Sequence, residues 1–360
     1  MPGKHQGCTK AVMMTLKWFN ATLDAIPVTT SWYLSSISEA MGRQELYKKQ
    51  SPQRLKSLKE FALIESAVSS NRIEGVEVDK KRIGTILFGK SQVQDRSEEE
   101  VRGYREALRL IHDSAPKLSL TEDACKELHR RIRGEIWDAG KYKEKDSSII
   151  ERYSNGSSSV RFHTVPADKT PFFMGELMDA WQKFERDARI PPLVGVAAFN
   201  LDFLCIHPFR DGNGRVSRLL MLLMCYHLGI EVGRFISLER LIEQNKERYY
   251  ETLKMSSEGW HEGKHNPWHY INFVCFIIKN AYEEFEKRLN ETPQPRGEKT
   301  SKIQDAVTKF YGNFSVADLQ RECPGVGIDM IRRVLKELQV KGVVECLGRG
   351  RGAQWIKIGN

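Results

Sequence analysis

Two apolar stretches separated by a short polar segment constrain the fold of this chain more than any other feature. Residues 193–206 and 219–228 are almost entirely apolar, whereas residues 207–218 read His-Pro-Phe-Arg-Asp-Gly-Asn-Gly-Arg-Val-Ser-Arg. A helix that is apolar on all sides has to be buried in a core. The sequence therefore predicts two core helices joined by a tight polar turn, around which the rest of the chain is organised.

The polar turn has the residues of an anion-binding site. Gly212 and Gly214 allow positive φ angles or a close approach to a ligand, and the Asn213 amide can donate hydrogen bonds. The free N–H groups at the start of the second helix favour negative charge. Arg215 and Arg218 are three residues apart and project from one side of that helix. The pattern is typical of a phosphate cradle, although it lacks the Lys of a P-loop and the third glycine of a dinucleotide fingerprint.

Two further side chains indicate a reaction site. His207 can take a proton near neutral pH, and Asp211 supplies the oxygen ligands that Mg²⁺ prefers. A single histidine of this kind would more often be an ordinary helix-end residue beside solvated arginines. The concentration of all these residue types within twelve positions favours the functional interpretation.

The segment from His207 to Arg218 matches H-x-F-x-[DE]-G-N-G-R-x-x-R at every position, and therefore resembles the signature of the Fic family. The resemblance implies a mainly α-helical fold with a β-hairpin flap, and the transfer of AMP from ATP to a hydroxyl side chain of a target protein, which could be the chain itself. It also implies that Phe209 is buried and fixes the turn. Family members commonly pair, so a homodimer is a further expectation.

The resemblance assigns a role to each residue of the turn. The catalytic base that deprotonates the acceptor Ser, Thr or Tyr would be His207, and the Mg²⁺ ligand would be Asp211. The phosphates would be held by an anion hole of Gly212, Asn213 and Gly214, with Arg215 on the β-phosphate and Arg218 on the γ-phosphate. ATP and Mg²⁺ are thus the expected substrate and cofactor.

A second segment resembles the inhibitory helix of Fic proteins. Ser70 and Glu74 lie four residues apart in the pattern [ST]-x-x-x-E-[GN], with Gly75 suited to end the helix. The resemblance implies that Glu74 pairs with Arg218 and occupies the position of the γ-phosphate, so that the chain inhibits itself. The alternative is a surface glutamate near a helix end.

Two more segments, a hairpin and a pair of tyrosines, are expected to lie beside the turn. Residues 149–152 and 160–163 alternate around an Asn-Gly pair, which predicts a β-hairpin, and in Fic proteins such a flap aligns the target. Tyr249 and Tyr250 resemble the aromatic pair that borders the adenine site of the family. An ordinary surface hairpin and two packing tyrosines are the alternatives.

The chain divides into four parts. We expect an N-terminal helical region with the inhibitory helix at 1–96, a catalytic domain at 97–290, a linker at 291–300 and a small C-terminal domain at 301–360. The last part has the helix and strand order of a winged helix, and the stretch from Arg296 to Asn360 carries a net charge of +5. Binding of DNA is one prediction for it, and protein binding or dimer formation is the other. The basic groups that would suit DNA phosphates are Arg332, Arg333, Lys336, Arg349 and Arg351.

The composition narrows the possible cellular locations of the protein. The net charge is +9, no apolar run approaches the ~20 residues of a membrane span, and no signal-peptide core is visible. Seven scattered cysteines without a Cys-x-x-Cys pair favour reduced thiols in a cytoplasmic protein. Two alternative functions remain beside AMP transfer. One is a nucleotide-sensing, DNA-binding regulator, and the other is removal of AMP or transfer of another phosphate-linked group at the same site.

Overall fold

The computed structural model describes residues 14–23, 25–50, 52–79, 82, 83, 86, 95–152, 156–187, 189–290, 298–308, 310, 312–323, 326–348, 350 and 352–358. The chain forms two compact units, Met1–Leu289 and Asn290–Asn360. Each unit has its own hydrophobic core. Residues 291–297 of the predicted linker lie outside the described residues.

The first unit is mainly helical, as the sequence predicts. Its described helices are α1 (Thr15–Thr22), α2 (Val28–Gln50), α3 (Pro52–Ile73), α5 (Arg96–Ser114), α6 (Glu122–Arg133), α7 (Thr170–Asp187), α8 (Pro192–Ile206), α9 (Asn213–His227), α10 (Leu238–Gln244), α11 (Lys246–Ser257) and α12 (Trp268–Asn290). Short 3₁₀ turns lie at Ala115–Lys117, Ala167–Lys169, Val232–Arg234 and Trp260–Glu262. None of the described helices is both long and apolar enough to span a lipid bilayer.

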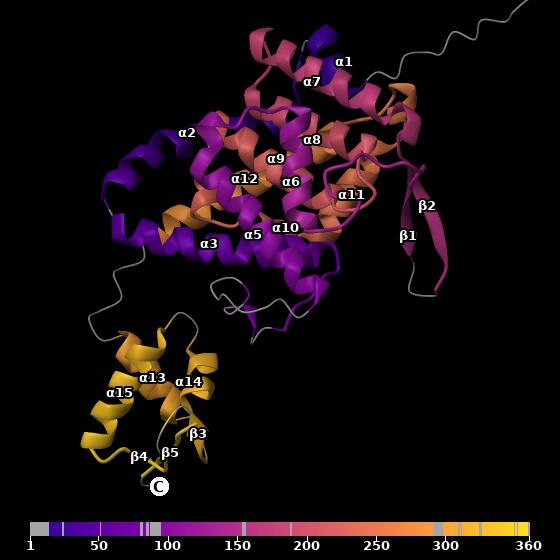
Figure 1. The fold of residues 1–360 in the computed structure, drawn as a ribbon. Coiled ribbons are helices and arrows are strands. Elements are labelled where there is room, and N and C mark those ends of the chain that lie inside the picture. Colours follow the sequence, from indigo (N-terminus) through magenta and orange to yellow (C-terminus); the bar gives the residue numbers. More distant parts are fainter. Residues whose placement is uncertain are drawn as a thin grey trace, which may run out of the picture. The chain divides into compact units, whose positions relative to one another are not determined.

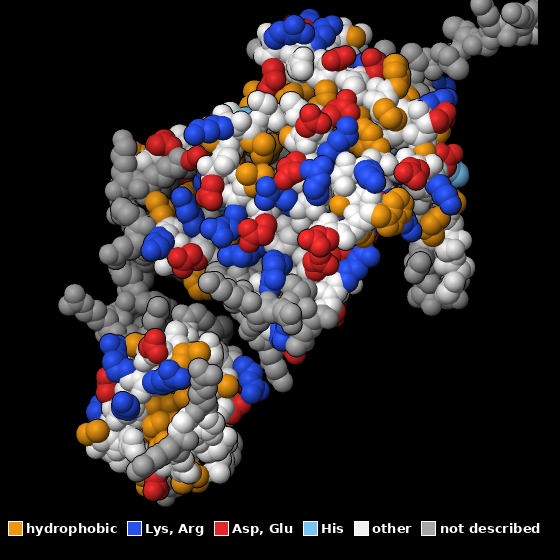
Figure 2. All heavy atoms as spheres, viewed as in Figure 1, with side chains coloured by type: hydrophobic (Ala, Val, Ile, Leu, Met, Phe, Trp, Pro, Cys, Tyr) orange, Lys and Arg blue, Asp and Glu red, His pale blue; other side chains and the backbone are white. Residues whose placement is uncertain are grey.

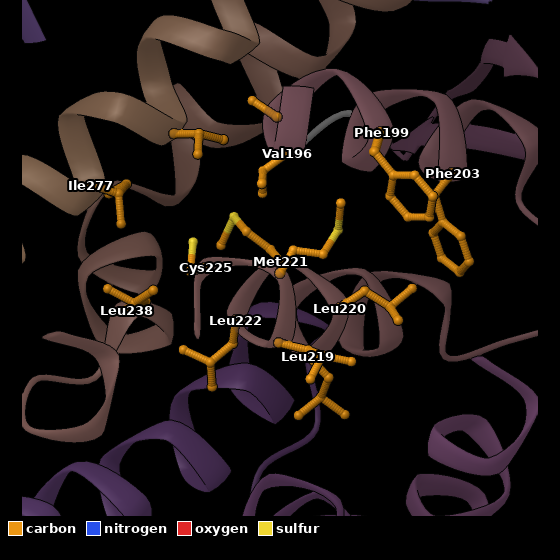
Figure 3. Packing of buried hydrophobic residues seen from close by; sticks show 14 of the residues in the cluster. Val196, Phe199, Phe203, Leu219, Leu220, Met221, Leu222, Cys225, Leu238 and Ile277 are labelled. Carbon is orange, nitrogen blue, oxygen red and sulfur yellow. The ribbon is translucent and has the colours of Figure 1, made fainter. Parts of the chain in front are cut away.

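Helices α8 and α9 form the centre of this unit (Figure 1). Every residue of α8 from Leu193 onward is buried, as expected for a helix without a polar face. Figure 3 shows Phe199 and Phe203 of α8 beside the apolar side chains of α9, among them Leu220 and Met221. Because the two helices are packed on nearly all sides, the short turn between them is attached to the most rigid part of the unit.

Helix α3 runs along the same body and packs against α5 and α10. It ends at Ile73, and Gly75 follows with a φ of +81°, a conformation that glycine adopts without steric cost. The N-terminus of α5 is capped by Asp95, whose side chain accepts a hydrogen bond from the Glu98 N–H. This arrangement brings the end of α3 and the start of α5 close to the start of α9.

The predicted hairpin is present as β1 (Ser148–Arg152) and β2 (Ser158–His163), which pair antiparallel. The register shifts between Ile149 and Ile150, where the partners change from Phe162 to Val160. Figure 1 shows the two strands extending from the edge of the helical body, beside α11. The hairpin is therefore anchored at its base, next to the turn between α8 and α9.

The second unit contains α13 (Glu298–Thr308), β3 (Phe314–Ser315), α14 (Val316–Glu322), α15 (Ile328–Val340), β4 (Val344–Cys346) and β5 (Gln354–Lys357). Its small sheet has the order β3-β5-β4. Ile303, Leu319, Leu335 and Trp355 belong to the core that joins the helices to this sheet. Arg349 and Arg351 lie outside the described residues. The assignment of this unit as a winged helix stays a prediction.

Candidate active site

The turn between α8 and α9 is held in one conformation by its own side chains. Helix α8 ends at His207, which has left-handed backbone angles of φ 54° and ψ 61°. The Asn213 side chain accepts a hydrogen bond from the Phe209 N–H at 2.9 Å and donates one to the Phe209 carbonyl at 2.8 Å. Phe209 is fully buried, as predicted, and its ring stacks on His129 with 3.9 Å between the centroids. The turn is therefore rigid before any ligand binds.

The start of α9 carries two glycines that no larger residue could replace without backbone strain or a clash. Gly212 has a φ of +82°, and a Cβ on Gly214 would lie 2.2 Å from a Glu74 oxygen. The first N–H groups of a helix have no partner within the helix and carry partial positive charge. The structure thus places the predicted anion hole beside the Glu74 carboxylate.

His207 lines a cavity of about 550 Å³ together with Glu74 and Gly214. Its Nδ1 lies 3.3 Å from the Leu204 carbonyl oxygen. Because a carbonyl can only accept, this contact requires the proton on Nδ1 and leaves Nε2 with a free lone pair. Burial, reinforced by the positive charge of Lys143, lowers the pKa of His207 to about 4. The imidazole is therefore neutral at pH 7 and able to accept a proton.

Glu74 and Arg218 form the pair that the sequence predicts. Arg218 Nη2 donates to Glu74 Oε1 at 2.8 Å and to the Ser70 carbonyl at 2.9 Å, and Nε donates to Ser70 Oγ at 2.9 Å. The Arg218 side chain is 2% exposed and that of Glu74 is 30% exposed. The end of α3 thus saturates one edge of the guanidinium that was expected to bind a phosphate.

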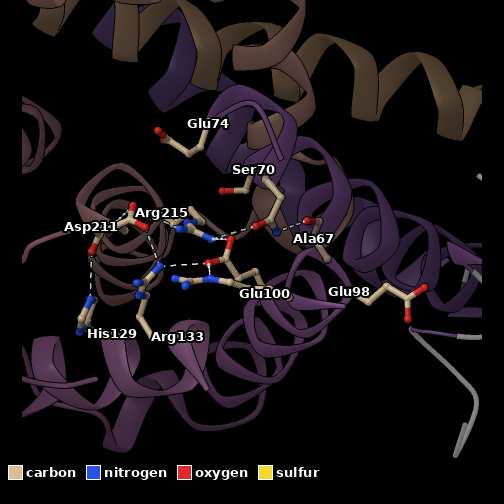
Figure 4. Close-up of polar contacts among 12 residues, drawn as sticks. Ala67, Ser70, Glu74, Glu98, Glu100, His129, Arg133, Asp211 and Arg215 are labelled. Atoms are coloured by element: carbon tan, nitrogen blue, oxygen red, sulfur yellow. Dashed lines mark hydrogen bonds and ion pairs between the residues drawn. The ribbon is translucent and has the colours of Figure 1, made fainter. Parts of the chain in front are cut away.

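Arg215 and Asp211 belong to a network that was not predicted (Figure 4). Glu100 of α5 accepts from Arg215 Nη1 at 2.7 Å and from Arg133 Nη1 at 3.0 Å, and Arg133 Nη1 also lies 2.6 Å from Asp211 Oδ2. The other oxygen of Asp211 accepts from the Gly212 N–H at 2.6 Å. Burial acts to raise the pKa of Asp211, but the charges of Arg215 and Arg133 bring it below its ordinary value.

The sequence contained a signal for the role of Glu100. It was missed because Glu100 follows two other glutamates at the start of a helix, where acidic residues are common. Glu100 lies four residues before Tyr104 and eight before Leu108, so it continues the buried face of α5. A glutamate on an apolar helix face needs a buried partner. Its partners, Arg215 and Arg133, come from two other helices, and their identity could not be read from local spacing.

The hairpin closes the other side of the cavity. Residues 148–151 of β1 and Arg161 and Phe162 of β2 line it. Lys254 of α11 forms an ion pair with Glu151 at 2.9 Å, and the His261 ring nitrogen lies 2.6 Å from the His163 carbonyl oxygen. These contacts fix the strands over His207.

Tyr249 and Tyr250 also line the cavity, and their place beside a bound adenine stays a prediction. Tyr249 is buried, and the Tyr250 hydroxyl donates to the Ile73 carbonyl at 3.1 Å. The Arg161 guanidinium lies over the Tyr250 ring, 5.8 Å from its centroid. Arg161 belongs to the predicted flap, but its contact with Tyr250 was not predicted. Sequence reasoning also missed the apolar residues of the same wall: Leu201, Leu204, Cys205 and Leu253.

Comparison with known proteins agrees with this geometry. The Fic/DOC family matches residues 119–225, which include the turn, the flap, all of α8 and most of α9. The chain therefore contains a Fic domain. Relatives of this Fic domain include the protein adenylyltransferase Fic of Drosophila melanogaster and that of Drosophila persimilis. Each is 26% identical over 211 residues, which is 57% of this chain and 39% and 38% of those proteins, respectively. The chain thus matches about two fifths of the length of these curated relatives.

Solved structures share the fold. A Fic family protein from Desulfovibrio desulfuricans covers 93% of this chain and 98% of its own, with a TM-score of 0.61 and 20% identity. A fragment of Fic-1 from C. elegans covers 73% of this chain and 74% of its own, with a TM-score of 0.58 and 19% identity. At these identities the likeness concerns the fold and supports the mainly helical class with its two-stranded flap.

Proposed function

We propose that this chain is a protein adenylyltransferase that moves AMP from ATP to a Ser, Thr or Tyr hydroxyl of a protein, and that Glu74 inhibits it. The observation that carries the proposal is one cavity lined by the neutral imidazole of His207, by Gly214 in the first turn of α9 and by the flap. The relatives named protein adenylyltransferases support it.

The chemistry requires little covalent participation by the protein. The acceptor oxygen attacks the α-phosphorus, the bond from that phosphorus to the bridging oxygen of the β-phosphate breaks, and pyrophosphate leaves. The hydroxyl proton passes to Nε2 of His207, which is unprotonated in the neutral ring. The helix N-terminus with Gly212, Asn213 and Gly214, together with Arg215 and Arg218, stabilises the phosphate charge.

The residues of the turn fit a magnesium ion. Asp211 presents a side chain that is 55% exposed beside the helix N-terminus, and no cluster of three potential metal ligands occurs in the described part of the chain. Mg²⁺ bound to ATP needs only one or two protein carboxylates, because phosphates and water complete its shell. Asp211 would hold the ion, which neutralises phosphate charge when bound.

Labelled ATP tests the function. The chain is incubated with ATP labelled at the α- or the γ-phosphate, with the protein itself and a lysate as acceptors. Label from the α-position on protein supports AMP transfer, and label from the γ-position supports a kinase-like reaction. If neither label is transferred, including by a variant without the Glu74 side chain, the proposal fails and a nucleotide-sensing regulator becomes the better description. Incubating the labelled product with fresh protein measures AMP removal.

We also propose that the second unit is a winged helix that binds DNA. Its element order supports this, as do Arg332 and Arg333 on α15, whose side chains are 56% and 66% exposed. Figure 2 shows Lys and Arg side chains on the viewed face of this unit. Changing both arginines to glutamate is expected to abolish retention on duplex DNA at low salt. Unchanged retention would favour the protein-binding or dimer-forming role. The cytoplasmic setting and the pairing of two chains stay predictions.

A further inference from the structure

Lys143 lies behind the catalytic turn, in the loop between α6 and β1. It is 5% exposed, which is unusual for a lysine. The residues that line the large cavity do not include it, and the proposed reaction gives it no part. A buried ammonium needs a physical reason, because its burial costs free energy unless its donors are satisfied.

The contacts of Lys143 enclose His207 from both sides. Its backbone N–H donates to the Pro208 carbonyl at 2.8 Å, and its Nζ donates to the Ile206 carbonyl at 3.1 Å. These two carbonyls belong to the residues directly before and after His207 in the chain. One residue thus bonds to the backbone on both sides of the catalytic base.

His207 needs such support because its backbone is strained. Among the described residues, no other non-glycine has a positive φ. A left-handed conformation costs free energy for a residue with a side chain and persists only where the surroundings impose it. The bond from Nζ to the Ile206 carbonyl is the part of this support that depends on the Lys143 side chain, because any residue at this position keeps the backbone bond to Pro208.

The same ammonium also reaches the base of the flap. Nζ donates to Thr164 Oγ1 at 2.7 Å and lies 3.5 Å from Ser147 Oγ, while the Thr164 hydroxyl donates to the Ser147 carbonyl at 2.8 Å. Ser147 directly precedes β1, and Thr164 directly follows β2. Lys143 therefore joins the point where the hairpin begins and ends to the turn that carries His207.

We propose that Lys143 is a positioning residue that locks His207 in its left-handed conformation and fixes the base of the flap against the catalytic turn. The inference rests on the proposed AMP transfer and adds a residue to it. Burial lowers the pKa of Lys143 to about 8. An apolar side chain of the same length would fill this space without that cost, so the charge is retained for its hydrogen bonds.

The experiment compares Lys143→Met with Lys145→Met, a change at an exposed lysine of the same loop, both in a Glu74→Gly parent. Rates of AMP transfer, KM for ATP and the Tm are measured for each. For Lys143→Met we expect kcat to fall about 10- to 100-fold, since a displacement of about 1 Å of a reacting group can cost that much. We expect KM for ATP to stay within about twofold and the Tm to stay equal or rise, because a buried charge is removed.

Three outcomes would overturn the inference. One is a kcat for Lys143→Met within about twofold of that for Lys145→Met. Another is a loss of kcat accompanied by a raised KM and a lowered Tm, which is the signature of general structural damage. The third is a Glu74→Gly parent that transfers no AMP, in which case the proposed function fails and the role of Lys143 falls with it.

Thr164→Val provides a second variant that keeps the buried lysine and removes its acceptor at the base of the flap. It decides the question if Lys143→Met does not fold. We expect kcat to fall about 5-fold or more with KM for ATP unchanged, because the change removes both the acceptor of the Lys143 ammonium and the donor to the Ser147 carbonyl. An unchanged kcat would contradict the link between flap and turn.

Discussion

Replacing Glu74 by glycine is the change whose effect the structure predicts most directly. Glu74 Oε1 accepts from Arg218 Nη2 at 2.8 Å and lies 2.2 Å from the position that a Cβ on Gly214 would take. The carboxylate therefore occupies the space beside the anion hole and uses a guanidinium edge that a phosphate would need. Removing it should raise the rate of AMP transfer, including transfer to the chain itself.

The size of the increase follows from the contact that ATP has to displace. A hydrogen bond between charged groups contributes about 1.5–3 kcal/mol, and Arg218 is buried enough for this range to apply. If ATP binds both states but reacts only when the Glu74–Arg218 pair is open, the closed state lowers the rate by the same free energy, even at saturating ATP. At RT of about 0.59 kcal/mol, this corresponds to an increase of about 10- to 150-fold for Glu74→Gly.

The assay is the initial rate of α-label incorporation at saturating Mg-ATP. Glu77→Gly is the matched control, because it removes an exposed glutamate three residues further along and adds the same backbone freedom. The control is expected to match the unmodified chain. If Glu74→Gly is no faster than Glu77→Gly at saturating Mg-ATP, inhibition by Glu74 is wrong, whatever the distance between the side chains.

Three more predictions concern the same domain. His207→Ala should lower kcat about 10²- to 10⁴-fold by removing the base, with the Kd for ATP, measured by calorimetry, within about twofold; a wild-type rate would remove His207 from the mechanism. Glu100→Gln should raise KM for ATP about tenfold, because Arg215 loses a charged partner at 2.7 Å, and an unchanged KM relative to Glu106→Gln would contradict this role. Acid should destabilise the fold, because burial lowers the pKa of four histidines to about 3 or about 4. Below about pH 6.5 the unfolded chain therefore binds more protons than the folded chain. By pH 5 each of these histidines lowers the free energy of unfolding by up to roughly 2 kcal/mol. Urea unfolding at pH 7.5 and 5 measures this loss, and equal free energies would refute it; the residues are His112, His129, His207 and His265.

The features that the sequence predicted share a local origin. The burial of α8 follows from its uniform apolarity, and the end of α3 follows from a glycine that tolerates positive φ. The turn from His207 to Arg218 lies in one unbroken segment, so its geometry depends on neighbours in the chain. The hairpin was found in the same way, since alternation around an Asn-Gly pair is a short-range signal.

The pairing of Glu74 with Arg218 joins residues 144 positions apart, and neither helical period nor turn chemistry could indicate it. It was predicted only because both segments resemble motifs of one family. Glu100 and Arg133 had no such motif and were missed, although they hold Arg215 and Asp211 as closely as Glu74 holds Arg218. Long-range polar contacts therefore stay hidden in a single sequence unless a known pattern contains both partners.

The missed residues change how the site is understood. The motif supplies groups that would contact ATP, but Arg215 is oriented by Glu100 from α5, and the backbone of His207 is held by Lys143 from the loop after α6. Electrostatic catalysis depends on charges that are already in place before the substrate binds, so the supporting groups matter as much as the contacting ones. A transplanted motif without Glu100, Arg133 and Lys143 should therefore bind nucleotide weakly and transfer AMP slowly, even with all of its signature residues present.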